Sequence, residues 1–280
     1  MKVISKDFYS VKKLDKFSIY PIGCTHLGAA GVNEERLKEV VKEIAADEHA
    51  YWIGLGDYGN FINRNDKKRF NPLELAPWIQ MKDLVDLPKA QVKKIREIFK
   101  PVAQKCLALV EGNHEREMKN HYERDVYMEI VDGIKQDGGF APEVSLATGY
   151  YGYLDLTFYR TDSRKDGSRQ FRISLHHGSA GTEIAAQKWL YAHECDIALF
   201  AHIHKTRITN VGVEYVDKAG QIKTKKRYAA HCGTFLTKKV EGVDDYGSIK
   251  GYAPPVEGGV VVEMRPLAEP RERSIRITEY

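Results

Sequence analysis

Short apolar runs alternate with longer segments of helical period along the chain. The apolar run 17–22 precedes a segment of helical spacing at 33–48, and further apolar runs stand at 50–57 and 106–112. This alternation is typical of an α/β or layered α+β domain and not of an all-β one. With 280 residues, of which 42% are hydrophobic, the chain is long enough to bury a full core. We therefore expect a single domain over residues 1–280.

The remaining segments can be assigned by the same reasoning. A polar, proline-punctuated insertion at about 60–105 contains helix-like stretches, and a further helix is predicted at 124–136. Two pairs of alternating runs, at 150–178 and 208–233, predict β-hairpins, and the first pair is joined by an Asp-Gly turn. The Pro- and Gly-rich tail after about 240 is expected to return as one last strand.

Composition narrows the class of protein. No apolar run approaches the roughly 20 residues that a membrane-spanning helix needs, and the first residues lack the apolar segment of a secretory signal, so we expect a cytoplasmic protein. The four cysteines form no CxxC pair and are expected to be reduced thiols. A formal net charge of +4 permits a polyanionic partner without requiring one.

Metal-capable or polar side chains stand directly after five of the apolar runs. They are Cys24 and His26, Asp57, Asn113 and His114, His176 and His177, and His202 and His204. The loops beyond the carboxyl ends of strands converge on one crevice in open α/β sheets, so these residues are expected to meet there. Carboxylate, imidazole and amide groups are suitable ligands for divalent metals. The pattern therefore predicts a metal centre.

The ordered set of motifs resembles the calcineurin-like metallophosphoesterases. It consists of "CTH" at 24–26, "GD" at 56–57, "GNHE" at 112–115, "HHG" at 176–178 and "AHIH" at 201–204. Each motif follows a strand-like segment, and the match extends from residue 17 to about 235. A lone GD carries no information, but the ordered set is highly specific. The resemblance implies a four-layer sandwich of two mixed β-sheets flanked by helices.

The resemblance also implies a binuclear centre of two divalent ions, chosen among Mn, Zn, Fe, Mg, Co and Ni. One ion would be held by Cys24, His26, Asp57 and His204, and the other by Asp57, Asn113, His202 and one histidine of the pair His176 and His177. Such ions hold a hydroxide that attacks phosphorus. His114 and Asn113 would bind the scissile phosphate, and His114 would assist the leaving oxygen. A neighbouring carboxylate such as Glu115 would orient His114.

Cys24 departs from the family pattern, which usually has Asp at this position. In one interpretation Cys24 ligates as a thiolate, which as a soft ligand favours zinc or iron over manganese or magnesium. In a second, Cys24 is a small buried apolar residue and the first ion is weakly held or absent. In a third, the site is degenerate and the protein binds without turnover.

His176 and His177 both stand at the end of an apolar run. Alternation along a strand sends neighbouring side chains to opposite faces, so only one imidazole is expected to face the metals. Spacing to Gly178 does not decide between the two histidines.

The resemblance favours a phosphodiester as the substrate class, with nucleic acid or nucleotides as candidate substrates. Basic clusters at 63–69, 160–169 and 223–227, with aromatic residues over 150–159, would form a phosphate-tracking groove if they faced the crevice. Otherwise they are solvated turns. A phosphomonoesterase or protein phosphatase, and a catalytically silent metal- or nucleic-acid-binding protein, are the alternatives.

Overall fold

The computed structural model describes residues 2–67, 69–162, 168–178, 182–217, 219–236, 257–268 and 274–280. Within these ranges the chain forms two six-stranded mixed sheets. Sheet A has the order β1-β6-β7-β8-β10-β9 and sheet B the order β12-β11-β2-β3-β4-β5. The strand bounds are β1 Lys2–Phe8, β2 Phe17–Ile22, β3 Ala50–Gly54, β4 Cys106–Val110, β5 Ala147–Gly149, β6 Tyr151–Tyr159, β7 Ser168–His176, β8 Ile197–Phe200, β9 Thr206–Val216, β10 Ile222–Cys232, β11 Val260–Met264 and β12 Ile275–Glu279.

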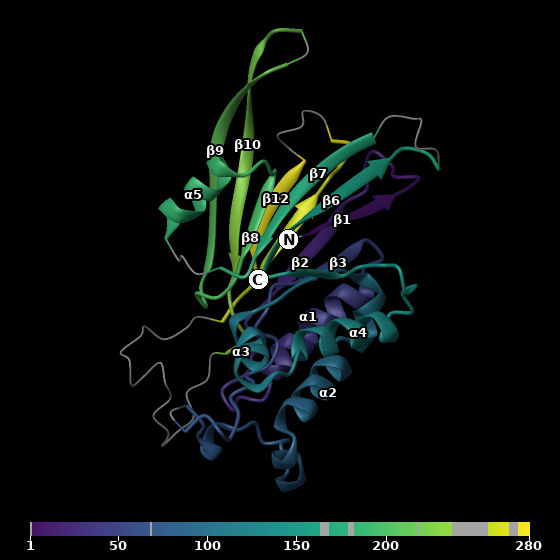
Figure 1. Cartoon of the computed structure of the whole chain (residues 1–280). Helices are drawn as coiled ribbons and strands as arrows, with labels where there is room; N and C mark the ends of the chain where they lie inside the picture. Colours follow the sequence, from purple (N-terminus) through teal and green to yellow (C-terminus); the bar gives the residue numbers. More distant parts are fainter. Residues whose placement is uncertain are drawn as a thin grey trace.

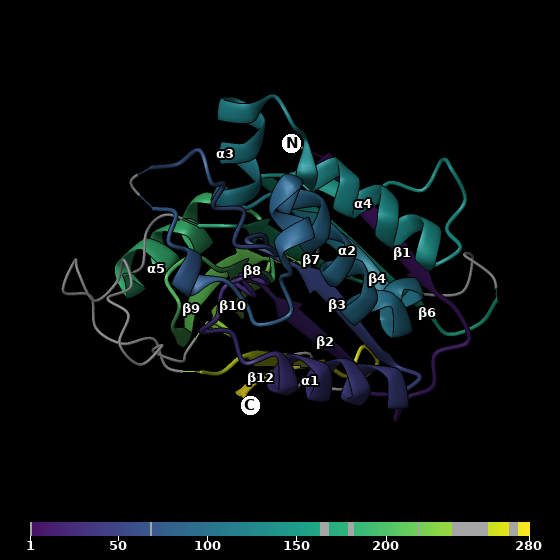
Figure 2. The ribbon, with the colours of Figure 1, turned by 90° about the horizontal axis from the view of Figure 1, so that it is seen from below.

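Helices flank both sheets. Their bounds are α1 Glu34–Ala46, α2 Leu87–Phe99, α3 Asn113–Tyr122, α4 Val126–Asp137 and α5 Glu183–Ala192, with 3-10 helices at Pro72–Glu74, Met81–Val85 and Lys100–Lys105. Helices α1, α2 and α4 lie over the outer side of sheet B, and α5 lies beside β9 and β10 of sheet A (Figures 1 and 2). Two mixed sheets flanked by helices confirm the predicted fold. No helix of the described ranges combines the length and apolar character that crossing a membrane would require.

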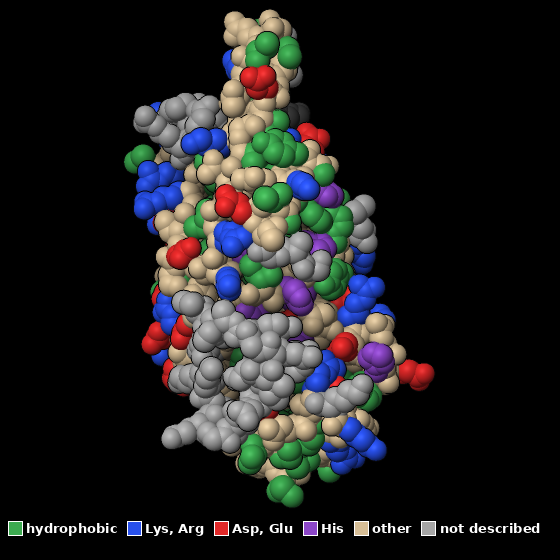
Figure 3. Space-filling model, turned by 90° about the vertical axis from the view of Figure 1, so that its left-hand side faces the viewer, with side chains coloured by type: hydrophobic (Ala, Val, Ile, Leu, Met, Phe, Trp, Pro, Cys, Tyr) green, Lys and Arg blue, Asp and Glu red, His purple; other side chains and the backbone are tan. Residues whose placement is uncertain are grey.

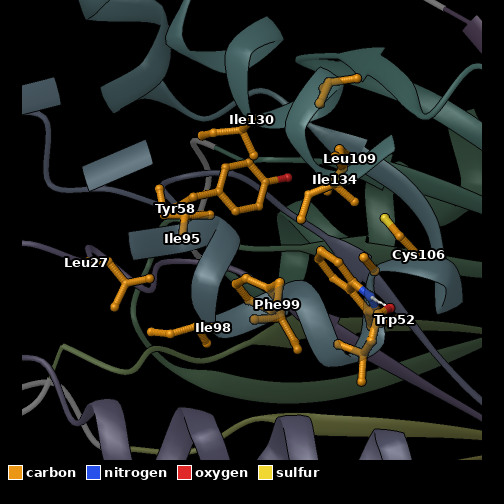
Figure 4. Packing of buried hydrophobic residues seen from close by; sticks show 14 of the residues in the cluster. Leu27, Trp52, Tyr58, Ile95, Ile98, Phe99, Cys106, Leu109, Ile130 and Ile134 are labelled. Atoms are coloured by element: carbon orange, nitrogen blue, oxygen red, sulfur yellow. Dashed lines mark hydrogen bonds between the residues drawn. The ribbon is translucent and has the colours of Figure 1, made fainter. Parts of the chain in front are cut away.

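The sheets pack through an apolar layer between them and a second layer under the helices. Ile19 and Ile53 of sheet B meet Phe171 and Ile173 of sheet A in the central layer. Under the helices, the Trp52 ring stacks on Phe99 with 4.5 Å between ring centroids, and its indole N–H donates to the Val102 carbonyl at 2.8 Å (Figure 4). Burial of such large side chains contributes about 1.5–3 kcal/mol each, so these two layers hold the strand ends that carry the site.

Helix α1 illustrates how local sequence leads to packing. The Asn33 side chain accepts from the Arg36 backbone N–H at 3.2 Å and so caps the helix. The apolar residues of this segment recur at helical spacing and are all buried; they are Leu37, Val40, Val41 and Ile44. The helix predicted from the spacing at 33–48 is therefore confirmed. The face packs into the cluster that contains Trp52.

Besides the three-residue β5, the strands β1 and β12 were not expected from the sequence. β1 pairs in parallel with β6 at the edge of sheet A, and most of its side chains are exposed. β12 pairs with β11, so the C-terminal region supplies two strands where one was expected. Edge strands bury few side chains and leave a weak alternation signal, which explains both omissions. The Asp-Gly turn predicted between β6 and β7 lies outside the described residues, as do residues 237–256 of the tail.

Candidate metal centre

The carboxyl ends of parallel strands from both sheets meet at one place. β2, β3 and β4 run parallel to one another in sheet B, as do β7 and β8 in sheet A. The loops that follow them are joined by backbone hydrogen bonds, from the Cys24 N–H to the Gly56 carbonyl at 2.9 Å and from the Ala201 N–H to the His177 carbonyl at 2.8 Å. Histidine side chains reach the surface on one face of the molecule (Figure 3). The predicted convergence is thus present in the structure.

A first set of donors comprises Cys24, His26 and His204, whose ligand atoms lie within 4.8 Å of one another. The Nε2 atoms of His26 and His204 are 3.0 Å apart. Burial, together with the neighbouring imidazole of His114, holds the pKa of His26 well below its usual range. Burial likewise lowers the pKa of His204 to about 4. Both rings are therefore neutral near pH 7, which is the form that ligates metals.

A second set of donors comprises Asp57, Asn113, His177 and His202. The Asn113 Oδ1 lies 2.9 Å from His177 Nε2 and 2.8 Å from His202 Nδ1. His177 Nε2 also lies 3.1 Å from Asp57 Oδ2. The other nitrogen of His177, Nδ1, is 2.7 Å from the Leu55 carbonyl, to which it donates. This bond places the lone pair of Nε2 among the donors, an orientation common among histidine ligands.

Asp57 lies between the two sets. Its Oδ2 is 4.0 Å from His26 Nε2 of the first set and 3.1 Å from His177 Nε2 of the second. The carboxylate is buried, with only 1% of the residue exposed. Burial by itself would raise the pKa of Asp57, yet the imidazoles of His114 and His177 hold that pKa well below its usual range. Asp57 is therefore ionised and placed where a carboxylate is able to serve two cations.

Cys24 is fully buried and points toward the same place. Its Sγ accepts the His202 backbone N–H at 3.1 Å. Burial and the negative charge of Asp57 raise the pKa of the thiol well above its usual value. Because the pKa of this thiol is raised, it becomes a thiolate only with a compensating cation nearby. The thiolate is the form that ligates metals.

The structure separates His176 from His177. His177 lies among the donors, whereas the His176 ring packs outside them, 4.9 Å from the Trp189 ring and 5.9 Å from the Tyr151 ring between centroids. The two imidazoles lie on opposite faces, as strand alternation requires. His176 is therefore excluded from the donor sets, and the choice that the sequence left open is decided by geometry.

Glu115 does not orient His114, so that expectation was wrong. Its carboxylate accepts backbone N–H groups of Asp57 at 2.9 Å, Tyr58 at 2.8 Å and Gly112 at 3.0 Å. Burial, with the negative charge of Asp57, raises the pKa of Glu115 to about 7 in spite of these bonds. A helical side chain at the third position turns back to the helix start, which places Glu115 beneath the loop of Asp57.

His114 is held instead by main-chain groups. Its Nδ1 lies 2.5 Å from the Asn60 carbonyl, and its backbone N–H donates to Asp57 Oδ1 at 3.0 Å. The ring stands edge-on to His26, with 4.7 Å between centroids. No side-chain pattern identifies a carbonyl partner such as that of Asn60, which is why sequence reasoning missed it.

Several donors occupy strained backbone conformations. Positive φ angles occur at five non-glycine donor residues, namely Cys24 (50°), His26 (43°), Asp57 (54°), His202 (71°) and His204 (54°). Such conformations cost about 1–3 kcal/mol each and persist where the surroundings impose them. Gly112 is required for a related reason, because a side chain there would collide with the backbone and carboxylate of Asp57. These conformations lower the stability of the fold, but they direct the side chains toward one point.

The basic clusters differ in what can be said of their position. Residues 223–227 lie on β10 at the end remote from Cys232, in the ribbon that extends beyond the sheets (Figure 1). Lys223 pairs there with Asp217, and Arg227 is buried. In the cluster at 63–69, Arg69 pairs with Asp66 and with Glu117 of α3. Half of the cluster at 160–169, residues 163–167, lies outside the described residues. The cluster at 223–227 therefore does not contribute to a groove at the site, and a groove formed by the other two clusters stays a prediction.

The donor types and their burial fit divalent metal ions. Comparison with known proteins concerns the chain as a whole. Among solved structures, the calcineurin-like phosphoesterase YfkN of Bacillus subtilis aligns with a TM-score of 0.45 and 10% identity, covering 94% of this chain and 90% of that one. A metallophosphoesterase of Sphaerobacter thermophilus aligns with a TM-score of 0.39 and 12% identity over 94% and 87% of the two chains.

The zinc complex of Vps29 from Entamoeba histolytica is also similar, with a TM-score of 0.41 and 11% identity over 94% of this chain and 98% of that one. The comparison with curated proteins gives no match. The family described as calcineurin-like phosphoesterase matches residues 17–206, which is more than half of the chain and contains all of the donor residues described above. The chain therefore belongs to the calcineurin-like phosphoesterase family.

Proposed function

We propose that this protein is a binuclear, metal-dependent phosphodiesterase, with nucleic acid or nucleotides as the substrate class. One ion is held by Cys24, His26, Asp57 and His204, and the other by Asp57, Asn113, His177 and His202. The observation that carries the proposal is the position of the ionised Asp57 carboxylate between two sets of donor side chains. A buried carboxylate is stabilised by cations, and it has two oxygens for two of them.

Bound ions of this kind activate water as a nucleophile near neutral pH and polarise phosphoryl oxygens. The chain itself supplies the proton transfer. Because Nδ1 of His114 donates to the Asn60 carbonyl, its Nε2 is the nitrogen left to protonate the leaving oxygen. The Asp57 carboxylate accepts the His114 backbone N–H, and this bond fixes the position of His114 relative to the donor sets. The preference for diesters rests on the resemblance of the motifs around Cys24 and His114 to that branch of the family.

The test is elemental analysis of the purified protein together with hydrolysis of bis(p-nitrophenyl) phosphate and p-nitrophenyl phosphate with added Mn, Mg, Zn, Fe, Co or Ni. We expect two ions per chain and faster turnover of the diester. Faster turnover of the monoester would instead identify a phosphomonoesterase. One ion or none, without turnover under any metal, would identify a binding protein with a broken first site.

The buried free thiols at all four cysteines support a reducing compartment such as the cytoplasm.

Substitution of Cys24 by Asp is expected to shift the metal preference from zinc or iron toward manganese. A carboxylate is a harder ligand than a thiolate, and Asp tolerates the positive φ of 50° at this position. The measurement is turnover of the nitrophenyl diester across the metal series, with metal content determined in parallel.

Cys106→Ser is the matched control, because Cys106 is also buried but lies at the start of β4, away from the donors. Its metal preference should equal that of the unmodified protein. An unchanged preference in Cys24→Asp would show that the sulfur is a packing group and not a ligand.

A further inference from the structure

Arg116 extends the site beyond the donor residues. It lies on α3 three positions after Asn113, so the two side chains leave the helix on the same face. The residue is exposed, and within the described parts of the chain no carboxylate forms an ion pair with it. Its charge acts on Glu111, where it opposes the rise in pKa that burial causes. A positive charge without an ion-pair partner among the described residues thus lies on the helix that carries Asn113 of the second donor set.

Tyr150 holds this cation in position. The guanidinium carbon of Arg116 lies 5.3 Å from the centroid of the Tyr150 ring. That ring lies 5.7 Å from the ring of His177, and the Tyr150 carbonyl accepts the His177 backbone N–H at 3.3 Å. The Tyr150 hydroxyl donates to the Gly178 carbonyl at 3.4 Å. The tyrosine therefore connects the guanidinium to the histidine that faces Asp57.

Arg116 differs from the other described cations that stack on aromatic rings. Each of those also pairs with a carboxylate within the described ranges: Arg36 with Glu39 beside Tyr280, Lys94 with Glu34 beside Trp78, and Arg172 with Asp155 beside Tyr153. Their positive charges are compensated within the protein. Arg116 stacks in the same way but leaves its N–H groups available to an anion from outside.

We propose that Arg116 binds the phosphate adjacent to the scissile one in single-stranded nucleic acid, with Tyr150 as the residue that positions its guanidinium. A guanidinium lying against a ring keeps its in-plane N–H donors available, and their spacing matches two phosphate oxygens. This inference rests on the proposed function and adds a substrate preference to it. A diester with a single phosphate would lack the group that Arg116 recognises.

The kinetic test compares a short oligothymidylate with bis(p-nitrophenyl) phosphate as substrates of Arg116→Ala. A charge-assisted hydrogen bond contributes enough for about a tenfold effect or more. We expect the ratio of kcat/KM for the oligonucleotide to that for the nitrophenyl diester to fall by about this factor, mainly through KM. Arg116→Lys should restore part of the ratio, because lysine keeps the charge without the planar fork. Lys119→Ala on the same helix removes an exposed charge and should leave the ratio unchanged.

Binding gives a second readout that needs no turnover. Fluorescence anisotropy of a labelled oligothymidylate in EDTA, between about 50 and 200 mM salt, yields the slope of log K against log salt. Loss of one phosphate contact on a single strand should reduce this slope by about 0.7. Tyr150→Leu should give a similar loss of affinity, whereas Tyr150→Phe retains the ring and should bind nearly as the unmodified protein does.

The outcomes separate the two proposals. Unmodified protein that hydrolyses neither substrate with any metal would overturn the proposed function and this inference with it. If the diester is hydrolysed, an Arg116→Ala variant that keeps both the ratio of kcat/KM values and the slope of log K against log salt would overturn the inference alone. Equal losses on both substrates would also contradict it, because they would place Arg116 on the scissile phosphate itself.

Discussion

Substitution of Asp57 by Asn is expected to remove bound metal from both sites and to lower phosphodiester turnover by about a thousandfold or more. Among the described residues, Asp57 is the carboxylate within reach of both donor sets, 4.0 Å from His26 and 3.1 Å from His177 between the nearest side-chain atoms. The imidazole and amide donors carry no negative charge, and neither does Cys24 when its thiol is protonated, so the substitution removes the negative charge that attracts the two cations.

Asn is a better choice than Ala at this position. Asp57 has a φ of 54°, and a left-handed backbone costs most L-residues roughly 1–2 kcal/mol, whereas Asn adopts it more readily. Asn also retains an oxygen to accept the His114 N–H. Metal content by elemental analysis and unfolding in urea should be measured together, so that loss of metal is not confused with loss of the fold.

A matched control is Asp155→Asn, which alters another buried carboxylate at a distance from the donors, where it pairs with Arg172. This variant should keep its full metal content. Retention of two ions per chain in Asp57→Asn would refute the assignment of Asp57 as the shared ligand.

His114→Ala is expected to lower turnover by about 10²–10⁴-fold while leaving metal content unchanged. His114 belongs to neither proposed ligand set, and its Nδ1 is engaged by the Asn60 carbonyl. Its proposed task is to protonate the leaving oxygen. Its loss should therefore slow the reaction most where the leaving group is a poor one.

The leaving group provides the sharper measurement. Nitrophenolate departs readily without a proton, whereas the sugar hydroxyl of a nucleotide needs one. The rate loss of His114→Ala should thus be larger for an oligothymidylate than for bis(p-nitrophenyl) phosphate. His121 lies on the same helix and is exposed, so His121→Ala should change neither rate. Loss of metal in His114→Ala, or equal rate losses on both substrates, would contradict the role of general acid.

Helix α1 followed from the local spacing of residues 33–48, because capping and amphipathic periodicity depend on near neighbours. The edge strands β1 and β12 did not, because strands with few buried residues carry little periodic signal. The position of the basic cluster at 223–227, remote from the donors, could not be predicted either, since a run of charge does not reveal which end of a hairpin it occupies.

The sequence by itself determined the family, the alternation of strands and helices, and the identity of the residues that gather at the strand ends. Only the tertiary structure decided how these residues are used. It separated His177 from His176, because the two faces of β7 meet different layers. It placed Glu115 beneath the backbone of Asp57 and paired the His114 ring with the Asn60 carbonyl. It also brought Arg116 of α3 against Tyr150, which lies between β5 and β6. Each of these choices depends on contacts between segments distant in the chain, which no local pattern records.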